Sequence, residues 1–102
     1  MNKMVALIMF SAFTFVSPWA QAADVEAGKQ KAQACTVCHG AEGKSPPNEL
    51  WPNLAGQKAA YLAKQLKAFR DGARTDPLMN PMAKPLTDAD IENLAAYFSS
   101  LQ

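Results

Sequence analysis

The chain has 102 residues, of which ten are Lys or Arg and nine are Asp or Glu, so its net charge is only +1. A nearly neutral chain lacks the basic footprint that nucleic-acid binding requires, and we expect no nucleic-acid partner. At this length a hydrophobic core alone is barely sufficient for a stable domain.

The N-terminal residues form a segment that we expect to be removed. Lys3 gives a positive start, residues 5–16 are almost entirely apolar, and Ala20–Ala22 form a small-x-small cleavage site. A membrane-spanning helix needs about 20 residues, so this run is too short to be an anchor. We therefore expect a signal peptide at 1–22, cleaved after Ala22, one domain at 23–102 and no membrane span after cleavage. In a bacterium this export predicts a periplasmic protein.

A first helix is predicted over about 25–36, capped by Asp24, and it leads into Cys35-Thr36-Val37-Cys38-His39. The pattern C-x-x-C-H is typical of c-type haem attachment. Cysteines three apart on a helical turn share a face, with side chains about 5–6 Å apart, so each sulfur can form a thioether to one haem vinyl group. His39 can then bind the iron as the first axial ligand.

Three other interpretations of Cys35 and Cys38 remain open. A thioredoxin-like redox pair normally accompanies a βαβ unit, and the sequence contains no strand pattern. A closed structural zinc site takes four ligands, whereas the chain has two cysteines and one histidine. A plain disulfide is the third alternative, since an exported protein meets an oxidising environment.

A loop rich in Gly and Pro follows the motif, and a second helix is predicted over about 58–71, ending at Gly72. One face of this helix is apolar, formed by Ala59, Leu62, Ala63, Leu66 and Phe69. Residues 73–86 contain Pro77, Pro81 and Pro85, and we expect there an ordered loop without regular structure.

That loop holds Met79 and Met82, the two methionines that remain after signal removal. An electron carrier needs a fixed ligand on the second face of its haem, and a thioether favours reduced iron. Methionine is more often core filler, but it is the one soft ligand left here. We expect one of the two to bind iron, and spacing alone does not choose between them.

A third helix is predicted from a capping-box pattern at Thr87–Asp90 to about Ser100. The fold class is therefore all-α, with about three main helices and long loops packed around one haem. Charges are segregated along the sequence: basic residues lie in the middle, and the last helix opens with acidic ones. Such a dipole can be oriented by a charged partner, although solvated helix faces explain the pattern equally well.

The chain resembles a class I cytochrome c, and more closely a single-haem version of one half of a cytochrome c4. The resemblance covers the whole chain after the signal. It is carried by Cys35–His39, residues 52–57 (PNLAGQ), residues 61–66 (YLAKQL), Met79, residues 86–91 (LTDADI) and residues 94–98 (LAAYF).

The resemblance has several implications for individual residues. Met79 matches the family's methionine ligand, which leaves Met82 as the runner-up. Pro52 matches the proline whose carbonyl accepts the N–H of the ligating histidine, and Gly28 with Tyr97 matches a close glycine–aromatic contact between the first and last helices. Dihaem relatives have a second haem domain, and we expect only one here.

We accordingly expect a non-enzymatic periplasmic electron-transfer protein, with one covalent haem c, that docks transiently with respiratory redox proteins as a monomer or weak dimer. Candidate residues for an apolar docking rim are Val37, Pro46, Pro47, Pro81 and Met82. The alternatives are a tightly bound haem c subunit of an oxidase or dehydrogenase and, less favoured, a haem gas sensor or peroxidase.

Overall fold

A computed structural model describes residues 6, 8–9, 11–12, 22–47 and 50–102. The predicted signal peptide lies largely outside these residues, and its cleavage stays a prediction. The elements are α1 (Val25–Lys31), α2 (Gln33–His39), the 3-10 turn η1 (Ala41–Gly43), α3 (Ala59–Asp71), α4 (Met79–Ala83) and α5 (Asp88–Ser100). The described part contains no strand, which agrees with the predicted all-α class.

The first predicted helix is two helices, which corrects the single element expected over 25–36. As predicted, the Asp24 side chain caps α1 by accepting from the N–H of Ala27 at 3.0 Å. The chain then turns at Ala32, which is fully buried, and the N–H of Cys35 bonds to the carbonyl of Ala32 over three residues. The second helix continues through the whole C-x-x-C-H motif and ends at Gly40, whose φ is 87°.

The two long helices follow the sequence prediction closely. Gly72 ends α3 in the left-handed conformation, with φ 84°, which glycine adopts without steric cost. Thr87 and Asp90 form the predicted capping box of α5, each accepting the other's backbone N–H at 3.0 Å. Two orphan donors of the helix start are thereby satisfied.

The prediction that residues 73–86 lack regular structure was wrong, because α4 forms within them. Asp76 supplies the missing start signal: its Oδ1 accepts from the N–H groups of Leu78 and Met79, both at 2.9 Å. Pro81 is the third residue of the helix, where its missing N–H costs nothing because first-turn N–H groups have no intrahelical partner.

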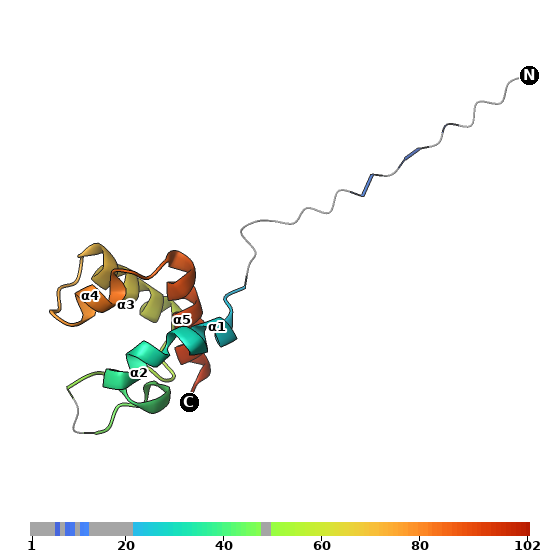
Figure 1. Cartoon of the computed structure of the whole chain (residues 1–102). Helices are drawn as coiled ribbons and strands as arrows, with labels where there is room; N and C mark the ends of the chain where they lie inside the picture. Colours follow the sequence, from blue (N-terminus) through green and yellow to red (C-terminus); the bar gives the residue numbers. More distant parts are fainter. Residues whose placement is uncertain (1–5, 7, 10, 13–21, 48–49) are drawn as a thin grey trace, which may run out of the picture.

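The long helix α5 is the centre of the packing, with α1 and α3 against it and α4 against α3 (Figure 1). Ile91, Leu94, Ala95 and Phe98 of α5 are almost fully buried and form the core with Leu62 and Ala63 of α3. In Figure 1, α2 lies on one side of the domain and α3 with α4 on the other. Within the described ranges, no helix is both long and apolar enough to cross a membrane.

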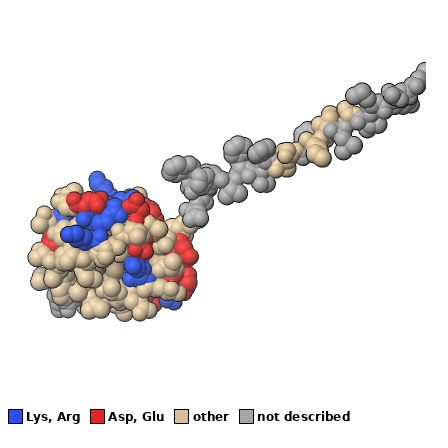
Figure 2. Space-filling model, turned by 45° about the horizontal axis from the view of Figure 1, so that its top comes forward, with Lys and Arg blue, Asp and Glu red and all other residues tan. Residues whose placement is uncertain are grey.

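The charges that are segregated in the sequence meet in space. Lys67 of α3 lies 3.1 Å from Glu92, and Arg70 lies 2.7 Å from Asp88 at the start of α5. On the face seen in Figure 2, Lys and Arg gather among Asp and Glu, and a broad neighbouring area carries neither. These ion pairs between α3 and α5 therefore reduce the separation of positive and negative charge that the sequence order suggests.

Candidate functional site

An apolar cavity of about 690 Å³ lies between α2 and the helices α3 and α4. Two helices contribute much of its apolar lining, with Leu62, Leu66 and Phe69 from α3 and Leu94 and Phe98 from α5. The cavity also brings together every residue that the sequence identified as a candidate ligand or attachment point: Cys35, Cys38, His39, Met79 and Met82.

His39 is the one strongly buried polar residue among those described, with 6% of its surface exposed. Its Nδ1 lies 2.8 Å from the carbonyl oxygen of Pro52. A carbonyl can only accept, so Nδ1 carries the proton and Nε2 keeps the lone pair that can bind a metal. Such a bond fixes both the tautomer and the ring orientation of a ligating histidine.

The Pro52 carbonyl is held in place by the loop around it. The N–H groups of Leu54 and Ala55 both bond to the carbonyl of Gly43, at 2.8 and 3.1 Å. Asn53 uses its side chain to accept from the N–H of Ser45 and to donate to the carbonyl of Ala55. The sequence resemblance pointed to Pro52, and the loop that positions it depends on contacts that are distant along the chain.

Cys35 and Cys38 lie on α2 and both face the cavity, and their thiols are not joined in a disulfide. Cys35 is half-buried and Cys38 is exposed. Burial raises the pKa of the Cys35 thiol, an effect partly opposed by a backbone hydrogen bond. Adjacent attachment points and a metal-binding nitrogen thus come from one helical turn.

Met79 and Met82 both line the cavity but differ in their surroundings. Met79 is half-buried at the start of α4, and its N–H is held by Asp76. Those backbone hydrogen bonds to Met79 and Leu78 keep the pKa of the Asp76 carboxyl below its usual value. Met82 is 47% exposed. The more enclosed and better-held methionine is Met79.

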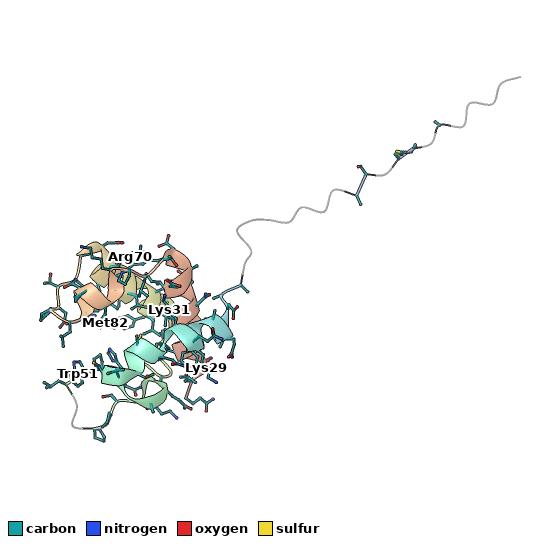
Figure 3. The ribbon with its side chains drawn as sticks, in the orientation of Figure 1. Lys29, Lys31, Trp51, Arg70 and Met82 are labelled. Atoms are coloured by element: carbon teal, nitrogen blue, oxygen red, sulfur yellow. The ribbon has the colours of Figure 1, made fainter. Side chains whose placement is uncertain are left out.

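Sequence reasoning missed several residues around the cavity mouth. Leu50, Trp51 and Leu78 line the cavity and are exposed, by 95%, 37% and 55%. Trp51 and Met82 come from opposite sides of the opening (Figure 3). Of the five rim residues expected from the sequence, only Pro81 and Met82 line the cavity, whereas Val37, Pro46 and Pro47 are exposed elsewhere. The sequence did contain a signal for the missed residues, because these apolar Leu and Trp residues lie within the predicted loops.

These residues fit a haem. The cavity is largely apolar, it is open at one edge, and it holds two thiols and a tautomer-fixed imidazole on one wall with a thioether contributed from α4. Nitrogen and sulfur donors of this kind are the axial pair that holds haem iron in cytochromes c.

Comparison with known proteins agrees with this reading. The family model described as cytochrome c matches residues 25–102. Cytochrome c-554(548) of Halomonas halodenitrificans is 46% identical over 82 residues, which are 78% of this chain and 98% of that protein. The thiosulfate dehydrogenase electron acceptor of Thiomonas intermedia is 45% identical over 84 residues, which are 82% of this chain but only 39% of that protein.

The solved cytochrome c4 of Acidithiobacillus ferrooxidans superposes with a TM-score of 0.73 at 36% identity, covering 83% of this chain and 54% of that one. The chain thus spans about half of a cytochrome c4, as the sequence resemblance implied. The cofactor that goes with this fold is covalently attached haem c with its iron. With the family model covering the whole helical domain, the chain belongs to the cytochrome c family and is an electron-transfer protein.

Proposed function

We propose that the protein is a periplasmic carrier, released from its signal peptide after Ala22, that moves one electron at a time between respiratory redox proteins. In this proposal Cys35 and Cys38 hold the haem, His39 and Met79 are the axial ligands, and the protein has no catalytic activity of its own. The observation that carries the proposal is the convergence of these four side chains on one apolar cavity.

Each of these residues has a distinct task. Haem c supplies a one-electron ferric–ferrous couple when it is bound. The Pro52 carbonyl keeps the imidazole of His39 oriented. The thioether of Met79 would fill the place on the iron that an external ligand would otherwise use. Leu62, Leu94 and Phe98 line the cavity with apolar side chains and exclude water from it.

The cavity mouth supports transient docking. Its exposed rim includes four apolar side chains, Leu50, Trp51, Leu78 and Met82. Lys31, Arg74 and Asp76 also line the cavity. Redox encounters typically use small interfaces, below about 1,200 Å², that separate quickly.

A tightly bound subunit is the alternative that a specific observation favours. One relative is named as the electron acceptor of a thiosulfate dehydrogenase, so its name associates it with an enzyme. The haem chemistry is the same in both cases, and only the residence time of the partner differs. Size-exclusion chromatography of the protein from its native periplasm separates the two: a carrier elutes as monomer or weak dimer, and a subunit elutes with its partner.

The spectrum of the holoprotein tests the carrier proposal directly. We expect a low-spin ferric haem with a sulfur-to-iron charge-transfer band, and a reduced protein that does not bind carbon monoxide. Rapid carbon monoxide binding by the wild-type protein would instead mean an open iron position and would favour the gas-sensor or peroxidase alternative.

A further inference from the structure

One side chain, Asn80, ties the segment before α4 to the end of α3. Its Nδ2 donates to the carbonyls of Phe69 and Arg74, at 2.9 and 2.8 Å. Its Oδ1 accepts from the N–H of Asp76 at 2.7 Å. Both amide protons and the amide oxygen of Asn80, the second residue of α4, therefore have partners at good distances.

The Asn80 amide is anchored to the C-terminal end of helix α3. Phe69 lies in the last turn of α3, where helix carbonyls have no intrahelical partner, so the Asn80 amide satisfies an orphan group. Arg74 is held separately: its guanidinium donates to Gln65 at 2.7 Å and stacks 4.5 Å from the centre of the Phe69 ring. The segment 74–80 is therefore bound to α3 at both of its ends, through Arg74 and through Asn80.

Met79 is the direct neighbour of this network. Its own N–H is bound by Asp76, and Asp76 is bound through its backbone N–H by Asn80. Met82 lacks this support among the described contacts, because its N–H makes only a long backbone bond to Leu78, at 3.4 Å. The network thus distinguishes the two methionines that face the cavity.

We propose that Asn80 is a positioning residue that keeps the Met79 thioether on the haem iron. The inference rests on the proposed ligation by Met79. An external ligand can reach the iron only after the thioether leaves, and the segment carrying Met79 can swing away only if the Asn80 amide releases Phe69 and Arg74. Asn80 therefore slows the replacement of the Met79 thioether by another ligand. It acts without contacting the donor atoms of the iron ligands or a substrate.

The test is the rate at which imidazole replaces the thioether in ferric holoprotein, followed by the loss of the charge-transfer band. In Asn80→Asp the side chain keeps its shape, but its two donors become an oxygen that faces two carbonyl oxygens. Imidazole binding should accelerate about tenfold, the size expected for losing roughly one net hydrogen bond. An Asn80→Asp protein that binds imidazole at the wild-type rate would overturn the proposal. Asn80→Ala, which adds no charge or repulsion, should also accelerate imidazole binding. It replaces Asn80→Asp in the test if that variant does not fold.

Two control variants separate a local effect from a general one. Asn93→Asp makes the same chemical change at the α1–α5 contact, where its Oδ1 accepts from the N–H of Asp24 at 2.8 Å and a carboxylate can do the same. Thr87→Ala removes the cap of α5 without touching segment 74–80. Both should bind imidazole at close to the wild-type rate. If Thr87→Ala accelerates binding as much as Asn80→Asp at an equal loss of melting temperature, the effect is global and the positioning role is refuted.

Met79→Ala distinguishes failure of this inference from failure of the ligand assignment. If Met79→Ala retains the charge-transfer band, Met79 is not the ligand and both proposals fall. If Met79→Ala loses the band while both Asn80 variants exchange imidazole at the wild-type rate, only the role of Asn80 is refuted.

Discussion

Gly28 of α1 lies directly against Tyr97 of α5, close enough that a Cβ on Gly28 would lie 2.9 Å from the Cβ of Tyr97 and would also overlap the carbonyl of Asn93. The sequence resemblance pointed to this pair, and the contact is confirmed. The absence of a side chain at Gly28 is what lets α1 and α5 cross so closely. This crossing sets the position of α2, the helix that carries His39.

Replacing Gly28 with Ala should therefore destabilise the fold. Overpacking of a tight contact typically costs 1–3 kcal/mol, so we expect a loss of about 2 kcal/mol and a melting temperature lower by about 10 °C. Thermal unfolding followed by circular dichroism measures it. Gln30→Ala, on the exposed face of α1, is the matched control and should change little. An unchanged melting temperature for Gly28→Ala would mean that the helices separate at no cost.

Covalent attachment of haem should depend on Cys35 and Cys38 together. Either single Ala substitution should leave one thioether, and the double substitution should leave none. A haem stain of a denaturing gel measures this directly, with the single variants as positive controls. Covalent haem that persists in the double variant would refute the attachment assignment.

Folding should depend on the haem. The cavity of about 690 Å³ lies against Leu62, Leu94 and Phe98, so without a haem the centre of a small core loses its packing partners. Apoprotein should show little helical circular dichroism and no cooperative melting, in contrast to holoprotein measured alongside it. A cooperative transition in the apoprotein would show that the helices suffice by themselves.

The two methionines should respond differently to substitution. Met79→Ala should abolish the sulfur-to-iron band, lower the reduction potential and allow carbon monoxide to bind reduced protein, because the thioether that favours ferrous iron is lost. Met82→Ala, the control, should have only a small packing effect. Loss of the band in Met82→Ala alone would exchange the two roles, and an intact band in both variants would exclude methionine ligation.

The start of α5 should make stability sensitive to acid. Hydrogen bonding from the N–H of Thr87, with help from Lys31, holds the pKa of the Asp90 carboxyl below its usual value of about 4. A carboxyl with a depressed folded-state pKa stabilises the protein above its unfolded pKa, and this contribution is lost as the pH falls through the folded value. The melting temperature should therefore drop below about pH 4, and less steeply in Asp90→Asn than in the wild type. Parallel curves for the two proteins would contradict this role.

The sequence by itself determined whatever depends on neighbouring residues. The cap at Asp24, the capping box at Thr87, the end of α3 at Gly72 and the C-x-x-C-H motif are all local, because the groups that interact lie within about one helical turn of each other. The apolar face of α3 was predicted equally well, since helical periodicity is a short-range pattern. Composition and spacing could also reduce the candidate iron ligands to His39 and two methionines.

The tertiary structure decided what depends on distant residues. The three prolines of 73–86 argued against a helix there. The start signal at Asp76 is local, but the helix is held in place by the Asn80 amide, which reaches back to Phe69 of α3. Charges that are separate in the sequence neutralise each other where Arg70 of α3 meets Asp88 of α5. The difference in exposure between Met79 and Met82 arises in the same way. The anchoring of α4 on α3, the charge pairing and the difference in exposure all come from contacts between segments that are distant in the sequence, which no local pattern encodes.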